Sequence, residues 1–309
     1  MSFTAINLTR LPAPQIIEQP DFETIFAARK ARLIELAQEF GDAAYVAALA
    51  AALELESEPL VHLLQEDSYR ELLLRAAVQD AGKGNLLAFA ERAMLDHLAA
   101  FYGVARQVIQ EADASVSPPI EEVLEDDERL RARVQLAPEG FTTAGSIGSY
   151  TFWALSASPL VKDVAVLEGM PPGEVHVAVL STEGDGTADA ALIQDVAAAL
   201  NAEDVRPLCD TVVVQSAAVV PYQIEAALTF YNGPDGAVVL AAAQAAIETY
   251  VADHHRLGHD ITLSGIFAAL HQEGVQKVTL AAPATDLVIG QGEAGYCTGI
   301  TLADGGRDV

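Results

Sequence analysis

The chain has 309 residues, of which 51% are hydrophobic, and its 17 basic and 44 acidic side chains give a formal net charge of −27. This length and composition exclude a disordered chain and predict two or three domains with buried cores. The acidic excess extends over the N-terminal, middle and C-terminal parts. It argues against nucleic-acid and membrane partners, because binding to phosphates and anionic lipids depends on Lys and Arg.

Cysteine content and N-terminal composition bear on the compartment. The two cysteines, Cys209 and Cys297, are too few for a disulfide framework, which favours reduced thiols in a cytosolic protein. The N-terminus has no basic start followed by an apolar run, so no signal peptide is expected. The longest apolar run, 43–53, is shorter than the roughly 20 residues that cross a bilayer.

Residues 1–117 are predicted to form an extended arm and a helical assembly region. Three prolines in residues 1–20 favour the arm. Helical patterns follow over 21–40, 43–64 with a break near Pro59, 68–79 and 85–103, the last after Gly82-Lys83-Gly84. In the last helix an apolar stripe is widened by its neighbours, which predicts burial on more than one side, against the chain's own core or a partner's helices. The stripe comprises Leu87, Met94, Leu98 and Phe101.

A central module is predicted over residues 118–220. Residues 114–128, which contain Pro and Ser and then an acidic run at 121–128, indicate a linker with a solvated helical start, and Arg129, Arg131 and Arg133 follow it. Two interpretations of these arginines are open: local charge neutralisation on alternate strand positions, or an interface. The remaining pattern predicts helices over 145–156 and 189–200 and strands over 161–167, 173–181 and 211–220.

A C-terminal module is predicted over residues 221–309. Its expected strands are 223–231, 275–281 and 286–289, its expected helices are 234–251 and 264–272, and 303–309 reads as a polar tail.

One unit occurs in both modules. Phe152-Trp153-Ala154 and Ile266-Phe267-Ala268 each precede, by nine residues, a strand of pattern Val-x-x-Val-x-aliphatic. The repeat predicts Trp153 and Phe267 at equivalent core positions. The predicted fold is therefore α+β, with an N-terminal helical region followed by two α/β, split βαβ-like modules in series.

Catalytic and cofactor motifs are incomplete. Gly290-x-Gly292-x-x-Gly295 matches a dinucleotide fingerprint, but it opens no predicted helix and indicates a flexible glycine loop. Gly82-Lys83-Gly84 lacks the rest of a phosphate loop, and Gly-x-Ser-x-Gly does not occur.

A metal site is the remaining chemical possibility. His255 and His259 are four residues apart, as on one helix face, but Gly258 weakens that helix and no adjacent glutamate supplies a base. A metal-dependent hydrolase using His255 and His259 is therefore kept as the alternative function.

Three stretches of the chain carry a family resemblance. They are Gly84–Ala90 with His97–Arg106; Asp127–Phe141 with Thr143–Tyr150, Ala154-Leu155 and Val161–Val164; and Gly258–Val275. In this order and spacing they resemble the baseplate J family of contractile-tailed phages and tailocins, over roughly residues 20 to 290.

The resemblance implies a structural wedge protein of the tail baseplate, with no catalytic residues, cofactor or metal. Such proteins pair with a second copy, contact smaller wedge proteins through N-terminal helices, and link wedges into a ring around the central hub and spike. Rearrangement of that ring triggers sheath contraction. The implied location is the virion, after assembly in the host cytoplasm, and a tailocin or secretion-system context is equally open. The candidate interface residues are Leu87, Met94, Leu98, Phe101, Tyr102, Arg106, Arg129, Arg131 and Arg133.

Overall fold

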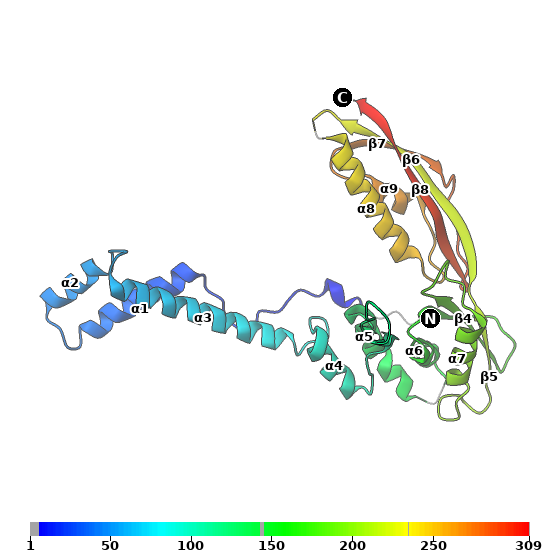
Figure 1. Cartoon of the computed structure of the whole chain (residues 1–309), viewed down its shortest axis with the longest axis horizontal. Coiled ribbons are helices and arrows are strands. Elements are labelled where there is room, and N and C mark those ends of the chain that lie inside the picture. The colour runs from blue at the N-terminus through cyan, green and yellow to red at the C-terminus, as the bar shows by residue number, and fades with distance from the viewer. Residues whose placement is uncertain (1–5, 143–144, 234, 309) are drawn as a thin grey trace. The chain divides into compact units, whose positions relative to one another are not determined.

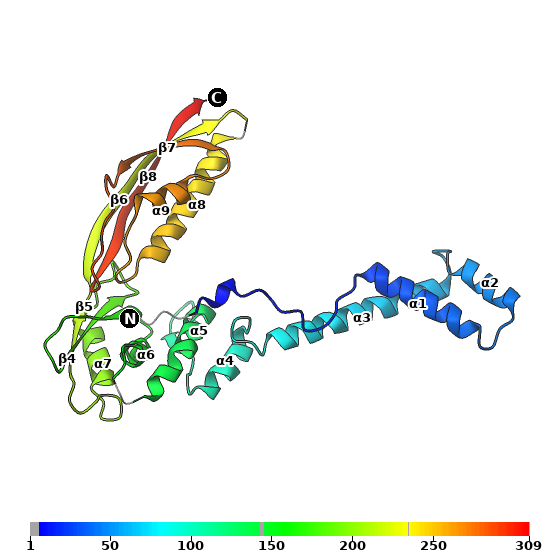
Figure 2. The same cartoon turned by 180° about the vertical axis from the view of Figure 1, so that it is seen from behind.

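The computed structural model describes residues 6–142, 145–233 and 235–308. The chain divides into two compact units, a helical unit from Ile6 to Phe101 and an α/β unit that begins at Tyr102. Figures 1 and 2 show the helices of the first unit and the two small sheets of the second from opposite sides. The expected α+β class, with helices first and sheets afterwards, is confirmed.

The helical unit contains η1 (Leu8–Arg10), α1 (Phe22–Ala37), α2 (Ala43–Ala52), α3 (Pro59–Lys83) and α4 (Arg92–Phe101). Asp21 and Asp42 start α1 and α2 by accepting hydrogen bonds from the amides of Thr24 and Tyr45. Pro59 is the first residue of α3, where a missing amide donor costs nothing. The predicted helix over 43–64 is therefore two helices, and the one predicted over 68–79 is the second half of α3.

The N-terminal arm is held against α3 by one buried amide. The side chain of Gln79 donates to the carbonyl of Pro14 at 2.7 Å and accepts from the amide of Ile16 at 2.8 Å. Gln79 is only 7% exposed, so these hydrogen bonds satisfy a polar group that would otherwise be costly to bury. The extended arm is thus observed from residue 6 onward, and its first five residues lie outside the described part.

The central module has a three-stranded sheet of order β3-β4-β5. Its elements are β1 (Val108–Gln110), β2 (Val123–Leu124), α5 (Asp127–Leu136), η2 (Ala137–Phe141), α6 (Ile147–Ala157), β3 (Val161–Val166), β4 (Glu174–Ser181), α7 (Ala190–Leu200) and β5 (Thr211–Ser216). Strands β3 and β4 are antiparallel, whereas β4 and β5 are parallel and joined through α7. Side chains of α6, α7 and the sheet share one core, with Tyr150, Val177 and Val196 at its centre.

Two sequence interpretations of this module are wrong. The segment predicted as a linker, 114–128, contains the loop and second strand of the β1–β2 hairpin and the start of α5. The arginines predicted on alternate strand positions lie on helix α5. Asp126 accepts a hydrogen bond from the amide of Arg129 and starts that helix. This capping residue is one of several acidic residues in a row, so the sequence does not show where the helix begins.

The C-terminal module contains β6 (Ala218–Tyr231), α8 (Gly236–His254), α9 (Leu263–Leu270), β7 (Val275–Ala282) and β8 (Glu293–Asp308). The sheet order is β7-β6-β8, with β7 antiparallel and β8 parallel to β6. Alternate residues of β6, including Ile224, Leu228 and Phe230, point into one core with α8 and α9. Both helices lie on the same face of the sheet (Figure 1).

The end of the chain differs from its prediction. Residues 303–308 are not a polar tail but the last part of β8, and no strand covers 286–289, where Leu287 forms a single bridge with Ile261. Residues 303–308 form backbone hydrogen bonds with β6, and this pairing does not depend on the polarity of their side chains. The prediction from composition was therefore wrong. The glycines at 290 and 292 form the turn before β8, and the predicted helix start at Pro234 lies outside the described residues.

The repeated unit has the expected form in both modules. Helices α6 and α9 each lead into an edge strand that is antiparallel to its neighbour. Trp153 is half-buried against the central core, but Phe267 is 38% exposed, so its predicted core position is wrong. Ile266 and Leu270, one helical turn apart, are fully buried in its place.

We expect Leu228→Ala to lower the free energy of unfolding by about 2–5 kcal/mol, because it leaves a cavity in a fully buried part of β6. Gln223→Ala, on the exposed face of the same strand, is the control and should stay within about 0.5 kcal/mol. Urea unfolding of the purified chain measures both. Equal losses in the two variants would contradict the assignment of the two faces.

Candidate assembly surfaces

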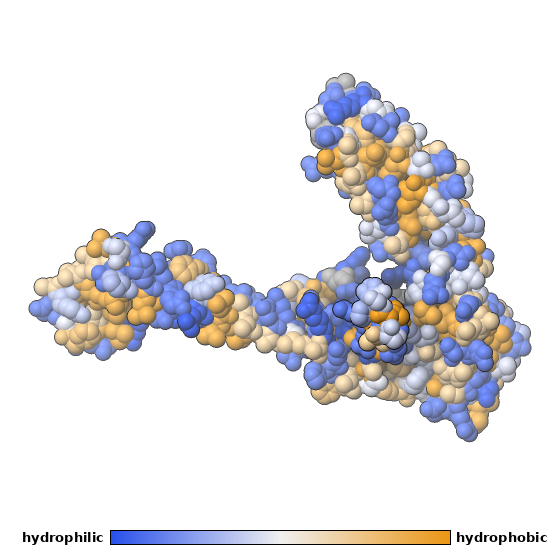
Figure 3. All heavy atoms as spheres, in the orientation of Figure 1, coloured by the Kyte–Doolittle hydropathy of each residue, from blue (hydrophilic) through white to orange (hydrophobic). Residues whose placement is uncertain are grey.

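The helical unit leaves nearly half of its large hydrophobic side chains exposed. It is less than a third of the chain, yet it contributes about half of the exposed large hydrophobic residues among those described. Figure 3 shows orange, hydrophobic residues on the visible surface of its helices. Soluble monomers rarely expose apolar area on this scale, so this surface has the character of an interface.

Helix α3 has two unlike sides. Val61, Ser68 and Gln79 are buried on one side, and ion pairs from Arg29 to Glu71 at 2.8 Å connect α1 to the helix. Hydrogen bonds from Arg75 and Arg29 lower the pKa of the Glu71 carboxyl, so these bonds favour its charged form. The exposed side carries leucines at positions 63 and 74, which are 11 residues, or about three helical turns, apart. The other exposed apolar residues of α3 are Leu60, Tyr69, Leu73 and Val78.

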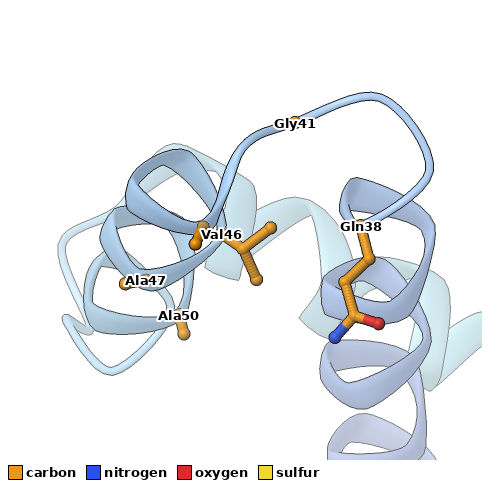
Figure 4. A pocket seen from close by; sticks show the side chains of 6 residues that line it. Gln38, Gly41, Val46, Ala47 and Ala50 are labelled. Carbon is orange, nitrogen blue, oxygen red and sulfur yellow. The ribbon is translucent and has the colours of Figure 1, made fainter.

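Helix α2 is apolar but has no core to face. None of its ten residues is buried, although eight of them are Ala or Val. An open hollow lies between it and the end of α1, lined by Gln38, Gly41, Val46, Ala47 and Ala50 among others (Figure 4). The sequence signal was the apolar run at 43–53, and small side chains of this kind allow another helix to approach closely.

The predicted interface residues near α4 are only partly exposed. Met94 is 50% and Phe101 86% exposed, and Tyr102, which begins the α/β unit, is 40% exposed. Leu98 is half-buried on α4, where Leu95 and Ala99 are fully buried. Leu87 is also half-buried, and it precedes α4, so it does not share the predicted helical stripe. The stripe failed because α4 begins at Arg92 and not at Asn85.

The predicted interface arginines instead point inward, toward one buried acid. Glu125 is 1% exposed, and its carboxylate lies 2.7 Å from Nη1 of Arg133 and 3.1 Å from Nε of Arg129. Burial lowers the pKa of the Arg129 guanidinium, and the charge of Glu125 opposes that effect. Arg133 is itself only 5% exposed. Its charge is therefore paired inside the module and is not accessible to another protein.

These arginines also bind backbone carbonyls of segments that are far apart in the chain. Arg129 donates to the carbonyls of Leu155, Ser158 and Val161, at the turn between α6 and β3. Arg106 donates to the carbonyl of Glu125 and pairs with Asp127 at 2.6 Å. The arginine cluster therefore joins the start of the module to α5 and to the repeated unit.

Arg131 is also internal. It is 6% exposed and pairs with Glu128 at 2.6 Å. Arg129, Arg131 and Arg133 pair internally, which agrees with the alternative of local neutralisation, but on a helix and not a strand. The interface role of Arg106 stays a prediction. Spacing could not reveal the internal pairing, because Glu125 is indistinguishable in sequence from its solvated acidic neighbours.

The two candidate metal ligands do not share a helix face. Helix α8 ends at His254, and Gly258 has a positive φ of 69°, so the chain turns between His255 and His259. Nδ1 of His255 lies 2.8 Å from the carbonyl oxygen of Gly295, whereas His259 is exposed. No group of three or more potential ligands that could hold a metal ion occurs in the described part of the chain. The alternative of a metal-dependent hydrolase has no structural support.

The surfaces just described are those of an assembly protein. Large apolar helix faces are exposed, and the charges of Arg129 and Arg133 are paired internally with Glu125. No helix in the described ranges combines the length and the hydropathy needed to cross a bilayer.

Comparison with known proteins agrees with this class. Three family models match, described as the baseplate J-like N-terminal domain at residues 56–113, the central domain at 142–216 and the C-terminal domain at 222–303. Baseplate protein J of Escherichia phage P2 is 46% identical over 303 residues, which cover 98% of this chain and 99% of that protein. The chain therefore belongs to the baseplate J-like family. It is a structural protein of a phage tail baseplate and not an enzyme.

A solved structure of a related kind also matches. It is the cryo-EM structure of the anti-feeding prophage baseplate, with 15% identity and a TM-score of 0.41. The match covers 62% of this chain and about half, 49%, of that one.

We expect Glu125→Ala to lower the free energy of unfolding by about 3–5 kcal/mol, because it leaves the charges of Arg129 and Arg133 buried without a partner. Glu66→Ala is the matched control. Its carboxylate also pairs with an arginine, Arg70, but both side chains are more than half exposed, so the loss should be below about 1 kcal/mol. Urea unfolding measures both, and a small loss for Glu125→Ala would show that the cluster is not a structural centre.

Burial lowers the pKa of His255 below its ordinary value of 6.5, with Lys162 adding to the shift and Asp185 opposing it. The unfolded imidazole therefore binds a proton more readily than the folded one. The free energy of unfolding should fall as the pH drops below 6.5 and level off below the folded pKa. His255→Asn should weaken this dependence, and His259→Asn, at an exposed position, should not. Urea titrations across this pH range test it, and identical pH profiles for the two variants would contradict it.

Proposed function

We propose that this chain is a wedge protein of the baseplate, which pairs with a second copy of itself and with other wedge proteins through its helical unit. The observation that carries this proposal is the exposed apolar area on α2 and α3. Burial of apolar surface is the main favourable term in protein association. A helical unit with so few buried side chains gains the rest of its core from a partner's helices.

The α/β unit supplies the connection to the rest of the baseplate in this proposal. Strand β8 lies at the edge of its sheet, and within residues 293–306 its outer side forms a single β-bridge, between Ala294 and Leu257. A long open strand edge can pair with another chain. We assign to it the linkage of wedges into a ring around the hub and spike.

The trigger for sheath contraction would pass through the junction between the two α/β modules. The carboxylate of Asp163 on β3 accepts the amide of Leu257 at 2.9 Å, and Ala178, Leu180 and Ala294 share a small core there. This packing supports transmission of a displacement of one module to the other. The chain would assemble in the host cytoplasm, and the same mechanism would serve in a tailocin or a secretion system.

The helical unit is tested by the double variant Leu74→Asp/Phe101→Asp. Both side chains are exposed, at 67% and 86%, so the isolated chain should keep its far-UV spectrum and its stability within about 1 kcal/mol. Tails produced with this variant should lack normal baseplates, as in particles made without the protein, because two charges prevent burial of the helix faces.

The matched control is Val288→Asp, which is 80% exposed on the C-terminal module and should complement normally. Electron microscopy of the particles gives the readout. Normal baseplates with the double variant would contradict the role of these helices in assembly.

A further inference from the structure

The hairpin of β1 and β2 has no core of its own. Between residues 108 and 124, which we name the acidic ribbon, every residue is exposed or half-exposed and none is buried. The two strands pair only with each other among the described residues, so both edges of the ribbon are open. A two-stranded ribbon of this kind is marginally stable in water without further packing.

Apolar side chains cover the acidic ribbon. The exposed fractions are 47% for Ile109, 41% for Val116, 37% for Ile120, 44% for Val123 and 46% for Leu124. They come from both strands and from the connecting loop. Such an exposed apolar patch beside open backbone edges is the arrangement that binds an added strand.

The base of the ribbon is held firmly by the arginine cluster. The amide of Gln107 donates to the carboxylate of Glu125 at 3.1 Å, and the amide of Glu125 donates to the carbonyl of Gln107 at 2.9 Å. The side chain of Gln107 also donates to the carbonyl of Ser156 at 2.9 Å. Because the base is already ordered, docking on the ribbon costs less conformational entropy than docking on a free loop.

Charge decides what can cover this surface. The ribbon contains Glu111, Asp113, Glu121 and Glu122, and the sequence has no Lys or Arg between Arg106 and Arg129. A second copy of the ribbon, with the same four carboxylates and no Lys or Arg, would bring like charges together. Anionic membranes and nucleic acids are disfavoured for the same reason.

We propose that the acidic ribbon is a docking site for a different protein of the same baseplate, which adds a basic, extended segment to the open edge of the ribbon. Main-chain hydrogen bonds would supply affinity, alternate apolar side chains would rest on Ile109 and Val123, and Lys or Arg would face the carboxylates. This interface is separate from the helix faces assigned above, and it relies only on the baseplate role of the chain.

A photo-crosslinker in assembled tails identifies the occupant. With p-benzoylphenylalanine replacing Ile109 in the full chain, irradiation should join the chain to a different tail protein, and mass spectrometry should place the crosslink in a basic, extended segment. The same replacement at the exposed Glu203 of this module is the background control. A crosslink to a second copy, to an acidic segment, or none above background would overturn the proposal.

Variants test the chemistry of the interface. Ile109→Asp/Val123→Asp and the charge reversal Glu111→Lys/Glu122→Lys should each reduce the crosslinked partner's content in purified tails at least about tenfold, equal to about 1.4 kcal/mol of affinity. Glu203→Lys should not. All three chains should keep their melting temperatures and still pair with a second copy, which separates this result from failure of the helical interface. Unchanged partner content would reject the docking site.

Discussion

The pairing of the buried Glu125 carboxylate with Arg129 and Arg133 is the interaction on which the rest of the α/β unit depends. The carboxylate pairs with both arginines, while Arg129 also binds the carbonyls that end α6 and lead into β3. A buried ion pair of this kind adds little net stability over an apolar core, but removal of one partner is costly. The cluster therefore specifies an arrangement: it fixes where the α/β unit begins, how α5 lies on the repeated unit, and from which point the acidic ribbon projects.

The two units of the chain differ in how far each one buries its own apolar surface. The α/β modules have complete cores, in which Leu228, Ile247 and Ile266 or Val177 and Val196 are fully buried. The helical unit buries few side chains, and α2 buries none. Association with another chain gains free energy only from apolar surface that is still exposed. The modules therefore supply a stable body, and the helices supply affinity for other chains. This division suits a structural baseplate protein.

The repeated unit and the open edges explain how such a body offers contacts without an active site. Both copies of the repeat place a helix before an edge strand of a three-stranded sheet. The histidines at the end of α8 are used in the same structural way, since His255 bonds to a carbonyl of β8 at the junction of the modules. Residues that could have carried chemistry make structural contacts instead. We place the function of the chain in its strand edges and helix faces.

The sequence by itself determined the α+β class and most helices and strands of the modules, because periodicity and capping residues act locally. The order and spacing of three motif stretches indicated the family. The sequence could not determine which side chains face inward. Arg133 is internal because it pairs with Glu125. Phe267 is exposed because Ile266 occupies the core position. Residues 303–308 form a strand because they pair with β6. The apolar run at 43–53 did indicate α2, whereas the exposed face of α3 and the acidic ribbon were not evident in the pattern. Burial, charge pairing and strand pairing join residues that are distant along the chain, so only the tertiary structure decided them.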